Sequence, residues 1–221
     1  VCYEYLDDVW KNVPEEPTPA GVAPIDALIG PVMDVFLHEA GHAVAFALGA
    51  VSVYRLAVAP EGAEAWRTDI RNGRMCTGLW GLCEKSDLVL PRQFLRWLMN
   101  EGCLHADGKG YEQLLKSPEG QARIEAFTEQ QHREIRAQMV GLLAGPAAEQ
   151  IYQGAELRLS SGGDLHEVLK AVDVSWLLPG HDEFEHAAEL TERTLRRPDV
   201  WAAVERLADE LADHAWNLRD A

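Results

Sequence analysis

The feature of this sequence that most limits its fold is a polar triplet inside an apolar run. His38, Glu39 and His42 form the pattern His-Glu-x-x-His, and most residues from 35 to 46 around them are apolar. In an α-helix residues i and i+4 lie about 40° apart on one face, so both imidazoles can reach one metal ion. The alternative is a surface helix with two solvated histidines, which the apolar flanks disfavour, because buried polar groups need partners. We therefore predict a helix over about 26–48 that binds Zn²⁺.

Glu39 lies beside the two histidines without having to bind the ion. A carboxylate in that place can take a proton from a metal-activated water and pass it to a leaving amine. Zinc lowers the pKa of such a water to about 7 in known hydrolytic sites. Gly41 and Ala40 are small and are expected to leave room beside the metal. The pattern predicts a zinc-dependent hydrolase with Glu39 as general base.

A hydrolytic zinc site needs a third protein ligand and one open position. The long motif with a third histidine is absent, so this ligand must come from later in the chain. Asp164 would open a helix, whose N-terminus favours a carboxylate. Glu149, in an apolar helical run, is the second candidate, and a structural carboxylate is its alternative role. The remaining candidates are His166, Glu167, His181 and His186, of which the last two are five residues apart, about 140° around a helix, and are expected to be solvated.

The remaining pattern predicts a mainly α fold with a small β-sheet, in the α+β class. Residues 1–25 hold four prolines among acidic residues and predict an extended arm or linker, with one domain over 26–221. Strands are expected at 51–58 and 75–83, joined by a loop or long hairpin connection. Further helices are expected at 88–105, 120–154, 164–176, 183–195 and 198–218, with interruptions of the helical pattern at Gly30-Pro31 and at Pro146, a helix stop at Gly49 and a turn at 179–180.

Charge and cysteine content limit the partners and the compartment. The formal net charge is −16, which disfavours binding to nucleic acid or to anionic membranes. None of the four cysteines forms a Cys-x-x-Cys pair, so we expect reduced thiols and a cytoplasmic protein, with a Cys76–Cys83 disulfide or metal pair as the alternative. No segment is apolar over the roughly 20 residues that span a bilayer. The chain begins with Val1, so a membrane anchor or another domain could precede it.

Several motifs in the same order resemble the peptidase domain of the FtsH-type AAA proteases, which are membrane-bound, ATP-dependent zinc metalloproteases. The resemblance covers about residues 32–216. It rests on the zinc motif at 38–44, on strand-like segments at 53–58 and 77–81, on 143–151, which is similar to the Gly-Gly-Arg-Ala-Ala-Glu-Glu helix, and on 161–165, which resembles the Gly-Ala-x-Asn-Asp-Leu stretch. The last Asp of that stretch is the family's third zinc ligand. The resemblance therefore implies a zinc endopeptidase with Asp164 as the third ligand.

The chain also departs from that family. Its 221 residues contain no ATPase module, Pro146 stands in place of the family's Arg, and an insertion is expected at about 84–128, longer than an ordinary loop. The expected substrate is therefore a peptide or an unfolded protein, with a partner ATPase or a homo-oligomer as further possibilities. Two alternatives are a catalytically inactive, zinc-stabilised protein-interaction module and a metal-dependent amidase.

Overall fold

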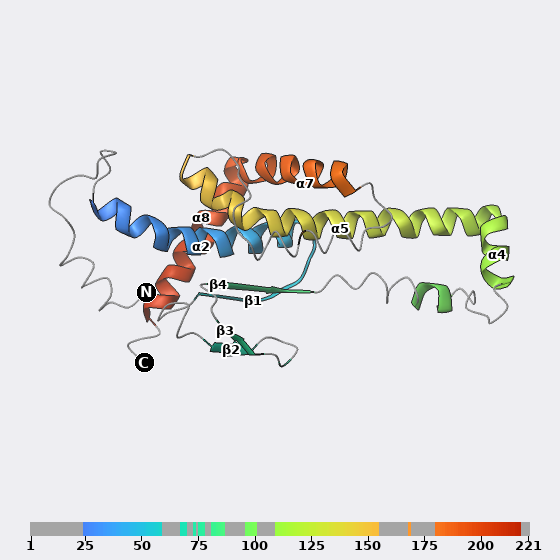
Figure 1. The fold of residues 1–221 in the computed structure, drawn as a ribbon, viewed down its shortest axis with the longest axis horizontal. Coiled ribbons are helices and arrows are strands. Elements are labelled where there is room, and N and C mark those ends of the chain that lie inside the picture. Colours follow the sequence, from blue (N-terminus) through green and yellow to red (C-terminus); the bar gives the residue numbers. More distant parts are fainter. Residues whose placement is uncertain are drawn as a thin grey trace.

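A computed structural model gives the fold, and it describes residues 24–58, 67–69, 73, 75–77, 81–86, 96–100, 109–154, 168 and 180–217. Within these residues helices predominate, and the strands form two small antiparallel pairs (Figure 1). The predicted class, mainly α with a small β-sheet, is confirmed. Almost all of the predicted N-terminal arm, and all of residues 155–167, lie outside the described residues.

Two long helices form the centre of the molecule. Helix α2 spans Pro24–Leu48 and helix α5 spans Pro118–Tyr152, and they lie along each other over much of α2 (Figure 1). The predicted interruption at Gly30-Pro31 is wrong, and α5 likewise continues through Pro146. The prolyl ring removes one backbone donor but fixes φ near −65°, which a helix accepts when other contacts hold it.

Two further helices complete the core, as predicted. Helix α7 spans Gly180–Leu195 and α8 spans Pro198–Asn217. Of the expected turn at 179–180, only Gly180 lies within the described residues, and it begins α7. One buried cluster joins α2, α5 and α8, and a second joins α5, α7 and the end of α2. The side chains most fully enclosed in them include Phe36, Phe46, Met139, Leu143 and Val204. No helix in the part of the chain described here is long and apolar enough to cross a membrane.

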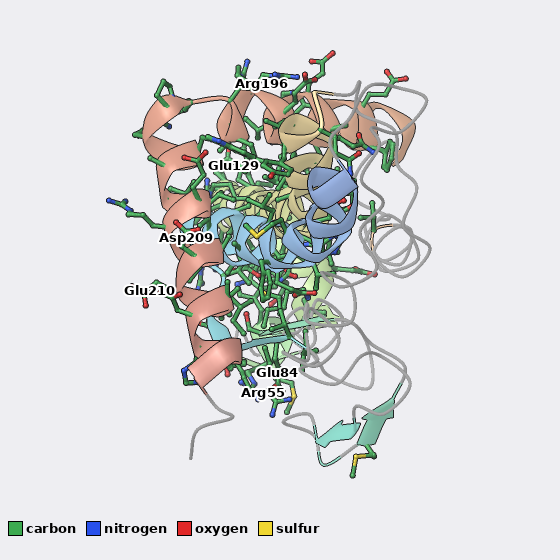
Figure 2. The ribbon with its side chains drawn as sticks, turned by 90° about the vertical axis from the view of Figure 1, so that its left-hand side faces the viewer. Arg55, Glu84, Glu129, Arg196, Asp209 and Glu210 are labelled. Atoms are coloured by element: carbon green, nitrogen blue, oxygen red, sulfur yellow. The ribbon has the colours of Figure 1, made fainter. Side chains whose placement is uncertain are left out.

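The sheet that lies against α2 has two strands, β1 and β4. Strand β1 spans Val53–Val58 and pairs antiparallel with β4, Gly81–Lys85, with Val58 opposite Gly81. Arg55 and Glu84 face each other across the pair at 3.7 Å, on the side away from α2 (Figure 2). The other face of β4 turns towards α2, since Lys85 lies 5.4 Å from the Phe46 ring centre. The sheet therefore covers one side of α2.

The second expected strand, 75–83, is divided between two pairs. Strand β2, Arg67–Asp69, pairs antiparallel with β3, Met75–Thr77, while β4 pairs with β1. The connection predicted over 59–74 therefore contains a strand of its own. Cys83 in β4 carries a thiol, so the alternative of a Cys76–Cys83 disulfide is wrong.

The predicted insertion contains a helical arm at the far end of α5. Helix α4, Lys109–Lys116, turns back against the start of α5, which extends well beyond α2 (Figure 1). Ser117 caps α5 by accepting a hydrogen bond from Gly120 N at 3.0 Å. The helix expected at 88–105 is described only at 96–100, where Trp97 stacks on Phe127 with ring centres 4.9 Å apart.

Candidate metal centre

The two histidines of the motif point their Nε2 atoms at each other. His38 and His42 lie one turn apart in the middle of α2, and their Nε2 atoms are 2.9 Å apart, with the rings almost perpendicular. Two nitrogens bound to one tetrahedral Zn²⁺ at 2.0–2.1 Å lie about 3.3 Å apart. The observed spacing differs from that value by a few tenths of an ångström, so the two side chains are arranged as a pair of metal ligands would be.

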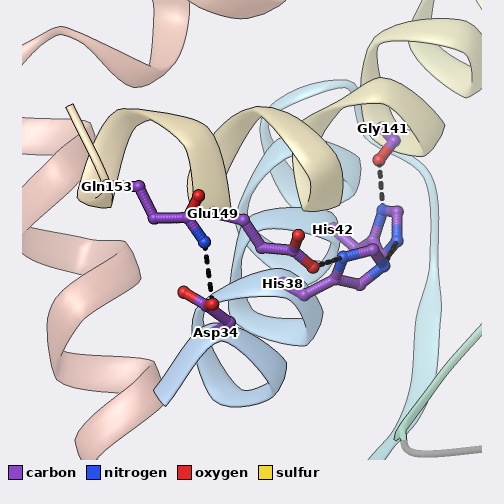
Figure 3. A network of polar contacts seen from close by, with 6 residues as sticks. All are labelled: Asp34, His38, His42, Gly141, Glu149 and Gln153. Atoms are coloured by element: carbon purple, nitrogen blue, oxygen red, sulfur yellow. Dashed lines mark hydrogen bonds and ion pairs between the residues drawn. The ribbon is translucent and has the colours of Figure 1, made fainter. Parts of the chain in front are cut away.

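Both Nδ1 atoms of the pair are engaged by atoms of α5 (Figure 3). His42 Nδ1 donates to the carbonyl oxygen of Gly141 at 2.7 Å, and His38 Nδ1 lies 2.5 Å from Glu149 Oε1. A carbonyl oxygen can only accept, so the proton of a neutral His42 must be on Nδ1. The Glu149 carboxylate selects the same tautomer for His38. In that state two Nε2 lone pairs face each other at 2.9 Å, an arrangement that a shared cation stabilises.

Glu39 is held beneath the backbone of β4. Its exposed fraction is 6%. A Cβ atom placed on Gly81 would lie 2.3 Å from Glu39 Oε1 and 2.5 Å from its Cγ, closer than any real contact of that kind. The strand can therefore approach the carboxylate this closely only because residue 81 is glycine, and the contact restricts where the carboxylate can move.

Glycines also set the distance between α2 and α5 at the histidines. A Cβ atom on Gly145 would lie 2.4 Å from His42 Nε2 and 2.8 Å from His38 Cδ2. Gly41, expected to leave room beside the metal, instead faces the helix interface, where a Cβ atom would meet Ala144 O at 2.6 Å. The residue that leaves space next to the converging nitrogens is thus Gly145 on α5, which the sequence pattern did not indicate.

The candidates for the third ligand fall into three groups. Glu149 contacts the Nδ1 atom of His38, so it orients the imidazole from the side opposite Nε2. His186 is exposed on α7, as expected for a solvated residue, and the side chain of His181 lies outside the described residues. Asp164, His166 and Glu167 also lie outside them. Over the described parts of the chain no group of three His, Cys, Asp or Glu side chains is placed to hold a metal ion.

Asp34 extends the polar contacts by one more turn of α2. Its Oδ2 accepts a hydrogen bond at 2.8 Å from Nε2 of Gln153, which caps the end of α5 four residues after Glu149 (Figure 3). Burial raises the pKa of Asp34, the hydrogen bond from Gln153 lowers it, and the charge of Glu149 raises it, with a net rise above 3.8. The sequence analysis did not single out Asp34, although its spacing of four residues before His38 was a signal that could have found it.

Comparison of the chain with family models, with curated proteins and with solved structures gives no significant match. The resemblance to the FtsH-type peptidases therefore stays a prediction based on motifs and their order. What the site can do follows from the geometry around His38, Glu39 and His42.

Proposed function

We propose that this protein is a zinc-dependent endopeptidase of the FtsH-like type, acting in the cytoplasm. The observation that carries the proposal is the convergence of His38 Nε2 and His42 Nε2 at 2.9 Å while both Nδ1 atoms are held by α5. Solvated surface histidines would not share this arrangement, because each would be free to turn towards water. A divalent cation at the two Nε2 atoms accounts for their convergence, and the partners on α5 account for the tautomers.

Three residues would hold the zinc ion in this proposal. They are His38 and His42 through Nε2, and Asp164 as the third ligand that the motif order implies. When bound, the ion would polarise the peptide carbonyl and lower the pKa of a water molecule to about 7. Glu149 and the carbonyl of Gly141 keep the two imidazoles in the tautomer that leaves Nε2 available.

Glu39 would serve as general base and then as general acid. It takes a proton from the attacking water as the water oxygen bonds to the carbonyl carbon, and delivers that proton to the amine nitrogen as the C–N bond breaks. Glu39 follows His38 directly and would lie beside the proposed ligands, and the backbone at Gly81 limits its movement. A carboxylate with an exposed fraction of 6% costs free energy to bury, and a catalytic role gives a reason to keep it there.

The proposed substrate is an extended peptide or an unfolded protein segment. Strand β4 begins at Gly81, against Glu39, and among the described strands it pairs only with β1. Its other edge could therefore bind an extended chain by backbone hydrogen bonds, which do not depend on substrate sequence. Folded proteins would need prior unfolding, by a partner ATPase or in a homo-oligomeric assembly.

The test compares Glu39→Gln with wild type after loading with zinc. We expect both proteins to bind one zinc ion and only wild type to cleave casein, because the amide cannot accept the proton. Glu210→Gln, which makes the same change on the exposed side of α8, is the matched control and should cleave at the wild-type rate (Figure 2). Full cleavage by Glu39→Gln would disprove the proposal. A zinc-loaded wild type that cleaves nothing would favour the interaction module instead, and cleavage of small amides alone would favour an amidase.

A further inference from the structure

Three polar contacts join one face of α2 to α5 and its C-cap residue, and we call them the polar ladder. They are His42 to the carbonyl of Gly141, His38 to Glu149, and Asp34 to Gln153 (Figure 3). The α2 members are four residues apart and meet α5 in reverse order, as expected for antiparallel helices. The first two contacts each fix an imidazole. The third contact, Asp34 to Gln153, touches no imidazole, so the proposed reaction does not explain why these two side chains are paired.

The third contact is a poor choice if it serves only to tie the helices together. Asp34 is partly buried, its Oδ1 is enclosed and accepts no hydrogen bond from any described residue, and the charge of Glu149 adds to the effect of burial on its pKa. Burial and that neighbouring charge make the ionised carboxylate unfavourable and raise its pKa. A neutral side chain at this place would give the metal-free protein greater stability.

We propose that Asp34 is a positioning residue of the metal site, which holds the carboxylate of Glu149 against His38 Nδ1. The inference rests on the proposed metal site. Two features of the contact support it. The negative charge of Asp34 repels Glu149, which leaves His38 as the favourable neighbour for its carboxylate. Asp34 also engages the amide of Gln153, which lies one turn from Glu149 and could otherwise donate to it and draw it from His38.

In this proposal, the charge of Asp34 lowers the stability of the metal-free protein and raises its affinity for zinc. A partner that orients a ligand imidazole typically changes metal affinity by about 10–100-fold. Asp34 acts one step further away, so we expect Asp34→Asn to weaken zinc binding about tenfold while the metal-free protein melts at a higher temperature. A contact that only ties the two helices would leave zinc affinity unchanged when the charge of Asp34 is removed.

The experiment uses the full chain and zinc alone. Zinc dissociation constants are measured by competition with a chromophoric chelator, and thermal unfolding is followed without metal, for wild type, Asp34→Asn and the control Asp209→Asn. The control removes one exposed carboxylate charge from α8 and should change neither quantity (Figure 2). Weaker zinc binding together with a higher melting temperature in Asp34→Asn supports the inference. An unchanged affinity, or a lower melting temperature, overturns it.

A double-mutant cycle then asks whether Asp34 acts through Glu149. In the Glu149→Gln background the repulsion between the carboxylates is absent, so adding Asp34→Asn should change zinc affinity by less than about twofold. A tenfold loss in both backgrounds would overturn the proposed route. If wild type and His42→Ala bind zinc equally weakly, the proposed function itself fails and the inference fails with it. If wild type binds zinc through His42 and Asp34→Asn binds it equally well, only the inference fails.

Discussion

The contact between Gly81 and Glu39 allows the proposed general base to be displaced without changing its chemistry. A Cβ atom on residue 81 would lie 2.3 Å from Glu39 Oε1, whereas ordinary contacts begin at about 3.4 Å. In Gly81→Ala the carboxylate, the strand or both must therefore shift by about 1 Å. The carboxylate is the end of a flexible side chain and the strand is held by β1, so we expect the carboxylate to take most of the shift.

The expected effect is on the rate of cleavage. A misplacement of about 1 Å at a reacting group can reduce the rate about 100-fold, which corresponds to about 2.7 kcal/mol in the activation barrier. Zinc binding should be kept, because the three atoms nearest the added methyl group all belong to Glu39. Steady-state cleavage of a fluorogenic peptide, with zinc content measured on the same samples, tests both expectations. The predicted signature is a fall in kcat with one bound zinc ion retained.

Gly49→Ala is the matched control for this substitution. Its added Cβ atom would lie 2.8 Å from the Cβ atom of Ala137, a crowded contact at the end of α2 that involves no group of the site. Both variants should lose stability through overpacking, by about 1–3 kcal/mol, but only Gly81→Ala should lose kcat. A Gly81→Ala protein that holds zinc and cleaves within threefold of the wild-type rate would refute the placement of Glu39 as the base.

Four other substitutions test separate parts of the structure. Glu149→Gln should weaken zinc binding about 10–100-fold by chelator competition, because the neutral amide holds the His38 imidazole less firmly. Gly145→Ala should weaken it by about 100-fold or more in the same assay, since its Cβ atom would overlap the His42 Nε2 position. Phe36→Ala should lower the free energy of unfolding by about 3–5 kcal/mol in urea titrations, because Phe36 is 2% exposed. The folded state binds the Asp34 proton more tightly than the unfolded state, so the contribution of Asp34 to the free energy of unfolding falls as pH rises from 3.8 through the raised pKa. In Asp34→Asn, thermal melts of the metal-free protein should therefore show a flatter dependence of stability on pH in that window.

The helical pattern around the motif was predictable because its signals are local. The predicted helix over 26–48 agrees with α2, Pro24–Leu48, within two residues, and the two closing helices agree within three residues. Spacing alone placed His38 and His42 on one face, and the structure brings their Nε2 atoms together. The chain leaves α2 beyond Gly49 with Ala50 at a φ of 56°, so the left-handed residue is one position later than a glycine stop would suggest.

The contacts of the two histidines could not be predicted from the sequence, because they depend on how α2 packs against α5. The partners of the two imidazoles, Gly141 and Glu149, are about a hundred residues away, and no local pattern indicates that a backbone carbonyl will accept from His42. The role of Gly145 likewise depends on where α2 and α5 come close to each other. In the sequence alone, a glycine in a helix indicates only a weak helix former. The strand prediction over 75–83 was wrong for another reason. The alternation over 75–83 is equally compatible with one strand or two, and pairing with β1 or β2 decides between them.

The geometry of the polar ladder would link folding to the proposed metal binding. In the metal-free protein the two Nε2 atoms face each other at 2.9 Å, and a proton on one of them is the simplest cation that relieves their repulsion. A proton and a metal ion would then occupy the same place between the two nitrogens. Because both Nδ1 atoms are held by α5, the imidazoles cannot relieve the repulsion by turning away unless the helix contacts break. The packing of α2 on α5 thus holds the two nitrogens together without any metal, and binding of the proposed zinc ion would offset the cost of that arrangement.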